Sequence, residues 1–200
     1  MVKLWMIQRL LLPIKKMTLK ELKDCQRQAE LIFNAQQITS ALSLQAKQIN
    51  TCLQALPDNS EPPIILPVMN GGLIYAGQLL PLIDIPVQVD YIHATRYRNT
   101  TEGFSLEWKA YPQHDLSNRV VVILDDILDE GLTLDAIIKF CKEKGAKTVL
   151  SAVLVTKLHE RRSENIVADF SALSVPDRYV FGYGMDYKGH LRNLDSIYAL

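Results

Sequence analysis

One stretch of the sequence places acidic side chains directly after a run of apolar ones. Residues 120–134 read VVVILDDILDEGLTL, and Asp125, Asp126, Asp129 and Glu130 fall within six positions. An ordinary turn needs one Asp or Gly, not four carboxylates that repel one another. The pattern indicates a site that holds a positive group or that needs a base.

The residues around these acids predict the elements that position them. Val120–Leu124 is a continuous apolar strand, and an amphipathic helix is expected over Leu132–Lys144, closed by Gly145. Ligands of a parallel sheet bind beyond the carboxyl ends of its strands. Gly131 allows a close backbone approach, and the helix N-terminus with Thr133 can bind a phosphate.

Acids beside an anion cradle suit a sugar phosphate whose hydroxyl groups face the carboxylates. A bound Mg²⁺ would help to hold such an anionic substrate. Taken alone, the pair Asp125–Asp126 is more often only an acidic strand end before a capped helix.

A second dense patch lies at 175–194, VPDRYVFGYGMDYKGHLRNL. Tyr179, Val180 and Phe181 can form a strand that offers an aromatic face and backbone groups to a flat heterocycle. Asp186 follows, and Arg192 can meet a phosphate with two hydrogen bonds. The alternative is a core aromatic strand with a surface arginine. The sequence has no P-loop motif, and 182–189 lacks the spacing of a dinucleotide fingerprint.

The rest of the chain alternates between helices and strands. Two helices are expected over 18–56, the first with a Thr18–Glu21 capping box. Then follow a loop over 57–63, a strand over 64–68, a helix over 72–82, and β segments at 87–94, 104–110 and 148–155. The polar segment 95–108 is expected to be a long loop or hairpin that serves as a lid. This order predicts an α/β fold with a parallel sheet covered on both faces.

Composition narrows the classes of function. Lys plus Arg equals Asp plus Glu at 22 each, which argues against a nucleic-acid binder. Three distant cysteines without a CxxC pair suggest neither a disulfide scaffold nor a zinc knuckle, and they favour a cytoplasmic setting. The four histidines show no metal-ligand spacing and are expected to be scattered and partly exposed.

The first 17 residues are apolar with basic flanks. Their apolar run is too short to span a membrane, and no cleavage site of a signal peptide follows. We expect an N-terminal extension from an early start codon, with Met17 as the true beginning; an interfacial helix is the alternative. Residues 18–200 are then expected to form a single domain.

Residues 120–134 resemble the phosphoribosyl-pyrophosphate (PRPP) signature of the type I phosphoribosyltransferases: four apolar residues, two acids, two apolar residues, Asp, a short residue, Gly, any residue, Thr. Together with VLVTK at 153–157, PDRYVFGYGMDYKGHLRNL at 176–194 and MNGG at 69–72, the chain resembles the hypoxanthine-guanine phosphoribosyltransferases of bacterial purine salvage over 18–200. The resemblance implies the type I fold, a mostly parallel sheet flanked by helices with a small hood from the N- and C-terminal segments.

The resemblance also implies roles for the sugar-phosphate site. Asp125 and Asp126 hold the ribose hydroxyls, and Asp129 is the general base beside purine N7. The 5′-phosphate lies in the turn formed by Asp129, Glu130, Gly131, Leu132 and Thr133.

For the base and the leaving group, the resemblance implies a further set of residues. Lys157 reads the 6-oxo group, Tyr179 stacks on the purine, and backbone groups of Val180 contact the ring edge. The pyrophosphate is bound by Arg192 and by a loop with a non-proline cis peptide, formed by Met69, Asn70, Gly71 and Gly72. Mg²⁺ is expected at Asp186 with Asp125 and Asp126, and the lid carries Arg96 and Tyr97.

Two positions depart from the family pattern. Asn70 stands where the family often has Lys, and Glu130 stands where it often has Thr. Both changes bear on the affinity for PRPP more than on the type of reaction.

The implied activity is transfer of the 5-phosphoribosyl group from PRPP to N9 of hypoxanthine or guanine, giving IMP or GMP and pyrophosphate. The implied partners are PRPP, the 6-oxopurine and further copies of the chain in a homodimer or homotetramer, with no nucleic acid and no membrane. The alternatives are a non-catalytic nucleotide- and RNA-binding regulator on the same fold and a xanthine-preferring enzyme.

Overall fold

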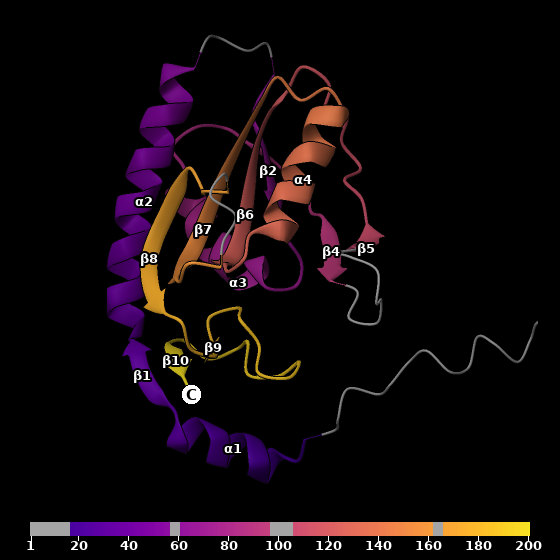
Figure 1. Cartoon of the computed structure of the whole chain (residues 1–200). Coiled ribbons are helices and arrows are strands. Elements are labelled where there is room, and N and C mark those ends of the chain that lie inside the picture. The colour runs from indigo at the N-terminus through magenta and orange to yellow at the C-terminus, as the bar shows by residue number, and fades with distance from the viewer. Residues whose placement is uncertain (1–16, 57–60, 97–105, 162–165) are drawn as a thin grey trace, which may run out of the picture.

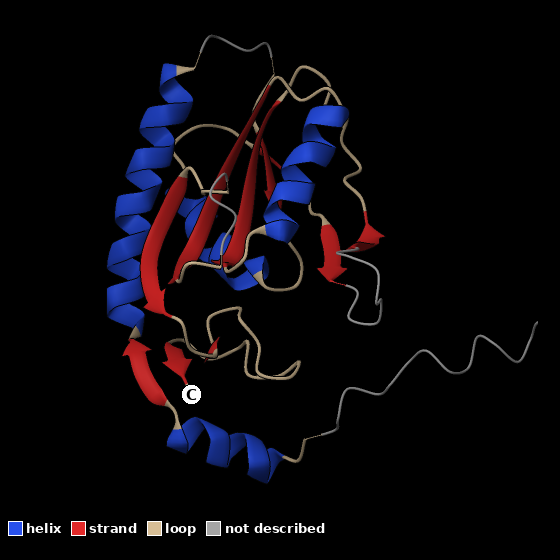
Figure 2. Ribbon diagram, in the orientation of Figure 1, coloured by secondary structure: helices blue, strands red, loops and turns tan. Residues whose placement is uncertain are grey.

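The computed structural model of the chain describes residues 17–56, 61–96, 106–161 and 166–200. Its centre is a five-stranded sheet in the order β3-β2-β6-β7-β8, shown in Figures 1 and 2. All neighbouring strands of this sheet pair in parallel. The strands are β2 (Ile64–Pro67), β3 (Gln88–Val89), β6 (Val120–Leu128), β7 (Thr148–Leu158) and β8 (Phe170–Pro176). The predicted α/β class with a parallel sheet is confirmed.

The two central strands run further than the sequence predicts. β6 continues four residues past Leu124 because Asp125 and Ile127 keep their places in the ladder with β7. Asp125 and Asp126, which were predicted at the end of the strand, therefore lie inside it. β7 likewise continues past Val155 to Leu158, which places Lys157 in the last part of that strand.

Helices cover both faces of the sheet, as predicted. α2 (Ala35–Ala55) and α3 (Gly72–Leu79) share one hydrophobic cluster with the sheet, and α4 (Leu132–Glu143) belongs to a second cluster on the other face. Gly145 follows α4 with a φ of 82°, the left-handed conformation expected after a helix C-cap. The helix predicted over 72–82 ends as a 3-10 turn, η2 (Leu80–Leu82), at Pro81.

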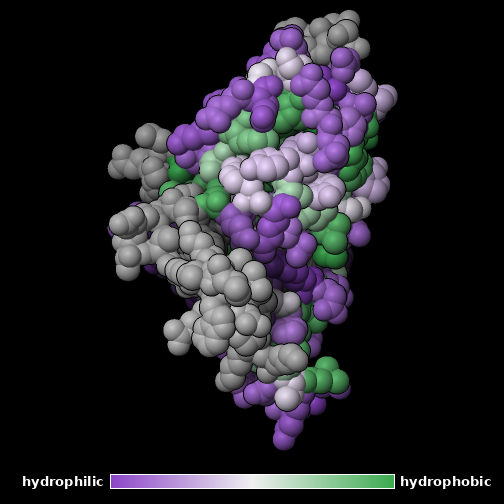
Figure 3. Space-filling model, turned by 90° about the vertical axis from the view of Figure 1, so that its right-hand side faces the viewer, coloured by the Kyte–Doolittle hydropathy of each residue, from purple (hydrophilic) through white to green (hydrophobic). Residues whose placement is uncertain are grey.

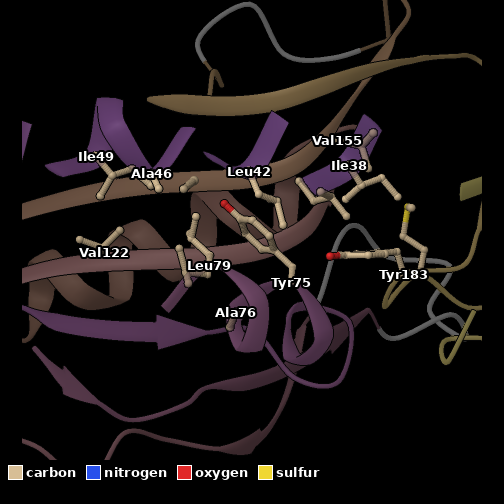
Figure 4. Close-up of a cluster of buried hydrophobic side chains, with 14 of the residues drawn as sticks. Ile38, Leu42, Ala46, Ile49, Tyr75, Ala76, Leu79, Val122, Val155 and Tyr183 are labelled. Carbon is tan, nitrogen blue, oxygen red and sulfur yellow. The ribbon is translucent and has the colours of Figure 1, made fainter. Parts of the chain in front are cut away.

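The cluster beneath α2 and α3 has a buried polar connection at its centre. The hydroxyl of Tyr75 donates to Gln45 Oε1 at 2.7 Å, and Gln45 Nε2 donates to the carbonyl of Val153 at 2.9 Å. Figure 4 shows Tyr75 among Leu42 and Leu79, with Tyr183 at the end of the cluster. The core therefore joins both helices to β7 and reaches the C-terminal segment.

A separate antiparallel sheet forms the hood. Its order is β1-β10-β9, from β1 (Glu30–Phe33), β10 (Ile197–Ala199) and β9 (Val180–Phe181). Figure 1 places this sheet and α1 (Leu19–Gln28) opposite the carboxyl ends of the central strands. The predicted hood from both chain ends is confirmed.

The N-terminal part of the hood corrects one prediction. The capping box of Thr18 and Glu21 is present, but the helix it starts ends at Gln28 and does not continue through Phe33. Residues 30–33 instead form β1, because β10 offers them an antiparallel partner. The sequence pattern did not indicate β8 or β10.

The segment predicted as one β stretch over 87–94 is divided between two sheets. β3 joins the central sheet, and β4 (His93–Arg96) forms an antiparallel hairpin with β5 (Leu106–Ala110). The predicted lid runs from this hairpin, and Tyr97 with the rest of 97–105 lies outside the described residues, as does most of the predicted extension over 1–17.

The surface seen in Figure 3 mixes hydrophilic side chains with smaller hydrophobic areas. No helix in the described part of the chain combines the length and the apolar character that crossing a bilayer requires.

Candidate active site

The predicted functional residues gather where β2, β6 and β7 end. The segment 69–72 follows β2, the acids of residues 125–130 lie at the end of β6, and Lys157 lies near the end of β7. The hood adds Tyr179, Asp186 and Arg192 from the opposite side. Four segments that are far apart in the sequence therefore lie close together.

Asp125 and Asp126 form a buried acidic pair. Each is about nine-tenths buried, and the backbone N–H of Asp126 donates to Asp125 Oδ1 at 3.0 Å. Burial and the neighbouring carboxylate raise the pKa of Asp125 well above its usual range, and burial raises the pKa of Asp126 against the opposing charge of Arg192. Such a pair is suited to accept hydrogen bonds from hydroxyl groups or to share a cation.

Asp129 has a different environment. Its Oδ2 accepts a hydrogen bond from Lys157 Nζ at 2.8 Å, and its Oδ1 lies 2.6 Å from His159 Nε2. Burial alone would raise the pKa of Asp129, but these two hydrogen bonds outweigh burial and lower it. Asp129 is therefore an ionised carboxylate that lies directly after β6 and is held by Lys157 and His159.

His159 is the residue that the sequence reasoning missed. The histidines were expected to be scattered and partly exposed, yet the side chain of His159 is only 3% exposed and contacts Asp129. The sequence offered no motif for it, because His159 follows β7 and meets Asp129 only where the ends of β6 and β7 lie side by side.

The turn between β6 and α4 provides an anion site. Gly131 adopts a φ of 85°, which favours glycine, and a side chain there would collide with Ile166. As the N-cap of α4, Gly131 has no side chain to occupy the first N–H groups of the helix. These groups and the helix dipole favour a phosphate at this end. Glu130, Leu132 and Thr133 lie in or beside the same turn, as predicted.

The segment after β2 packs tightly against the acidic pair. The Met69–Asn70 peptide is cis, as the resemblance implies. A Cβ on Gly71 would collide with the carboxyl group of Asp126, and one on Gly72 would lie 2.7 Å from the carbonyl oxygen of Leu124. Only glycines let this loop lie so close to β6.

Arg192 connects the hood to this loop region. Its Nη2 lies 2.6 Å from Asp186 Oδ1, and its Nη1 donates to the carbonyl of Gly184 at 2.5 Å and lies 3.7 Å from Asp126 Oδ2. The Arg192 side chain is 32% exposed, which leaves it accessible to a ligand. One cation therefore faces both the acidic pair and the hood.

An exposed aromatic ring contacts Asp186, the residue that Arg192 also contacts. Tyr179 is 49% exposed, and its hydroxyl donates to the backbone carbonyl of Asp186 at 3.1 Å. It directly precedes β9, so the strand predicted over 179–181 contains only Val180 and Phe181. The fixed ring offers a flat surface for stacking. Arg96 is the last residue of β4, and Tyr97 lies outside the described residues.

Comparison with known proteins identifies the class to which this fold and site belong. The family model of the phosphoribosyl transferase domain matches residues 32–188. The chain therefore belongs to the phosphoribosyltransferase family.

Within that family, similar curated proteins include hypoxanthine-guanine phosphoribosyltransferases. The chain is 34% identical to the one from Bacillus subtilis over 140 residues, which cover 69% of this chain and 77% of that protein. It is 26% identical to the one from Aquifex aeolicus over 183 residues, which cover 91% and 99%.

Solved structures agree on the fold. A hypoxanthine phosphoribosyltransferase from Staphylococcus aureus superposes with a TM-score of 0.77 at 24% identity and covers 86% of this chain and 90% of that one. The enzyme from Trypanosoma cruzi superposes with a TM-score of 0.75 at 23% identity, covering 86% and 95%.

Proposed function

We propose that this chain transfers the 5-phosphoribosyl group from PRPP to N9 of a 6-oxopurine, giving IMP or GMP and pyrophosphate. The observation that carries the proposal is the placement of Asp129. It lies between Lys157, which suits a 6-oxo group, and the phosphate-binding turn before α4. One carboxylate can thus reach a purine while the turn beside it holds the sugar phosphate.

The sugar phosphate is held by two sets of groups. Asp125 and Asp126 accept hydrogen bonds from the two ribose hydroxyls. These hydrogen bonds stabilise the charged form of Asp125, whose pKa is raised first by burial and then by the neighbouring carboxylate. The N–H groups at the start of α4, with the hydroxyl of Thr133, bind the 5′-phosphate.

The leaving group is held by the hood and by the loop after β2. Arg192 turns its exposed guanidinium to the pyrophosphate, and backbone groups of 69–72 approach it because Gly71 and Gly72 carry no side chains. Asn70 supplies no cation here, which gives Arg192 the larger share of charge neutralisation.

The carboxylates of Asp125, Asp126 and Asp186 suit Mg²⁺, which prefers oxygen ligands. The described residues contain no group of three acidic, histidine or cysteine side chains that holds a metal ion by itself. These carboxylates would therefore share the ion with oxygen atoms of PRPP, as Mg²⁺ sites with phosphate substrates commonly do. When bound, Mg²⁺ supplies positive charge to the departing pyrophosphate.

The purine is placed by stacking and by hydrogen bonds. Tyr179 stacks on the ring, and backbone groups of Val180 contact its edge. Lys157 moves from Asp129 to the 6-oxo oxygen, and Asp129 Oδ2 accepts the proton on N7. N9 then bonds to ribose C1 as the bond from C1 to pyrophosphate breaks, through a transition state with positive charge on the sugar.

The same residues favour an enzyme over a non-catalytic regulator. A protein that only binds nucleotide needs the phosphate turn but has no need for a carboxylate held ionised beside a lysine. The Asp129–Lys157 pair provides the two groups that removal of a proton from an oxo-bearing base requires.

The proposal is tested by incubating the protein with PRPP and Mg²⁺ and with hypoxanthine, guanine, xanthine or adenine in parallel. IMP and GMP should form, and adenine should give no product. Titration with IMP in a calorimeter measures nucleotide binding separately. Protein that binds IMP but forms no nucleotide from any 6-oxopurine would be a regulator, and the enzyme proposal would be wrong. Sedimentation of the same preparation tests the predicted homo-oligomer.

A further inference from the structure

A histidine holds the carboxylate that we propose as the general base. His159 directly follows β7, and its side chain is 3% exposed. Its Nε2 lies 2.6 Å from Asp129 Oδ1, while Lys157 Nζ lies 2.8 Å from Oδ2. Each oxygen of the carboxylate therefore has a donor of its own.

The backbone determines which nitrogen of His159 carries the proton. The N–H of Arg161 donates to Nδ1 of His159 at 3.1 Å. An N–H donor needs a lone pair on its acceptor, so Nδ1 carries no proton. The ring is then neutral with its one proton on Nε2, which donates to Asp129. Protonation of Nδ1 would break the contact with Arg161.

The segment that carries this N–H is tied to the neighbouring strand. The guanidinium of Arg161 makes two hydrogen bonds of 2.7 Å with the carboxylate of Asp177, which directly follows β8. His159 is thus oriented by β7 on one side and by a contact to the end of β8 on the other.

We propose that His159 is a positioning residue for phosphoribosyl transfer, which keeps Asp129 ionised and oriented after Lys157 has moved to the purine. This inference rests on the proposed function, in which Asp129 takes the N7 proton. Lys157 has a flexible stem and can exchange partners, whereas His159 is a buried ring held by the backbone. The contact with Oδ1 persists, and Oδ2 becomes the oxygen that reacts.

The proton transfer is balanced with this arrangement. The N7–H bond of the purine breaks, a bond from Oδ2 to hydrogen forms, and the electron pair stays in the purine ring. N9 uses its lone pair to bond to C1, and the pyrophosphate leaves with the electrons of its bond to C1. His159 keeps its own proton throughout, so it acts through Asp129 and not on the substrate.

Several charged groups surround Asp129 and determine how the pH dependence of kcat/KM changes when the His159 donor is removed. Lys157 and His159 contact it, Arg161 and Glu130 lie nearby, and Asp177 faces the Lys157–His159 side. Removal of the His159 donor leaves the charged form of Asp129 less stabilised, so its pKa rises. The acid limb of kcat/KM should then move to higher pH.

Two substitutions separate the donor from the bulk of the side chain. His159→Leu removes the donor, whereas His159→Gln keeps an N–H of similar reach. We expect the kcat of His159→Leu to fall by about 10- to 100-fold, because a reacting group loses its orientation. The acid limb of its kcat/KM profile should move to higher pH. His159→Gln should stay close to the wild type in both. Thermal melts of both variants check that they fold. A His159→Leu variant with the wild-type kcat and pH profile would overturn the proposal.

A measurement on the wild-type protein tests the proposal without any variant. ¹⁵N chemical shifts of labelled histidines should show a proton on Nε2 of His159 and none on Nδ1 under the conditions of the activity assay. A proton on Nδ1 would overturn the proposal.

The outcomes distinguish this inference from the proposed function. Wild-type protein without any nucleotide product contradicts the proposed function and with it the role of His159. Equal turnover by the wild type and His159→Leu contradicts the role of His159 alone.

Discussion

Gly71→Ala should destabilise the protein and weaken PRPP binding for a purely steric reason. The backbone at Gly71 has a φ of −60° and a ψ of −48°, a conformation that alanine adopts without strain. The added Cβ, however, would overlap the carboxyl group of Asp126. That carboxyl group is itself buried between β6 and Arg192, so it has little room to move.

The magnitude follows from the cost of adding a methyl group to a packed site. Overpacking costs about 1–3 kcal/mol, and about 1 kcal/mol shifts the melting temperature of a chain this long by roughly 2–4 °C. We therefore expect the melting temperature of Gly71→Ala to fall by about 2–12 °C. KM for PRPP should rise as well, because Asp126 is displaced from its position for the ribose.

Gly77→Ala is the matched control. Gly77 lies on the exposed side of α3, and a Cβ there meets no atom within 4 Å. Alanine in a helix interior is about 0.5–1 kcal/mol more favourable than glycine, so this variant should be slightly stabilised with an unchanged KM. Differential scanning calorimetry and steady-state kinetics compare the two variants. Equal melting temperatures, or an unchanged KM in Gly71→Ala, would refute the steric argument.

Three further predictions concern charged groups. Asp129→Asn should lower kcat by about 10²–10⁴, the usual contribution of a general base, while calorimetry still detects IMP binding; unchanged kcat would exclude Asp129 as the base. Arg192→Gln should raise KM for PRPP by about 10- to 150-fold, since a hydrogen bond to a charged group contributes about 1.5–3 kcal/mol, and an unchanged KM would place the pyrophosphate elsewhere. Asp90 accepts hydrogen bonds from the backbone N–H groups of Gln113 and His114 and contacts the His114 ring. Burial raises the pKa of Asp90, but these contacts and a hydrogen bond from the Tyr91 N–H outweigh burial and lower the pKa below 3.8. Its stabilisation is thus present above the unfolded-state pKa and is lost as pH falls through the lower folded-state value. Asp90→Asn should therefore cost about 1–3 kcal/mol at pH 7, and urea unfolding should show the difference shrinking below about pH 4; a difference independent of pH would contradict this assignment.

The central sheet could be predicted because its strands are continuous apolar runs. Val120–Leu124 is buried on both sides, and such a run indicates a parallel strand whatever surrounds it. The ends of the strands were harder to predict, because Asp125 continues β6 through its backbone pairing with β7. A sequence pattern predicts the end of a strand at the first polar side chains. In the structure, backbone hydrogen bonds to the neighbouring strand carry the strand past them.

The hood was harder to read from the sequence because it depends on contacts between the two ends of the chain. Glu30–Phe33 has apolar residues at helical spacing after α1, yet it forms a strand because β10 lies beside it. The three residues of β10 are too few to show a period of their own. Such pairings between distant segments become visible only in three dimensions.

The candidate site also contains residues that local sequence patterns predict and a residue that only a contact between distant segments reveals. Asp125, Asp126, Asp129 and Lys157 were found because they belong to local motifs with a recognisable spacing. His159 belongs to no motif, and its contact with Asp129 spans 30 residues of sequence. Its importance arises from the parallel alignment of β6 and β7, which brings the ends of the two strands together.

The central claim is that one active site joins a phosphoribosyl group to a 6-oxopurine with loss of pyrophosphate. The most direct measurement follows IMP and pyrophosphate together after the protein is mixed with PRPP, Mg²⁺ and hypoxanthine. The account predicts that both products appear in equal amounts and at the same rate. Release of pyrophosphate without formation of IMP would contradict the account. A protein that binds added IMP but forms none from PRPP and hypoxanthine would contradict it as well.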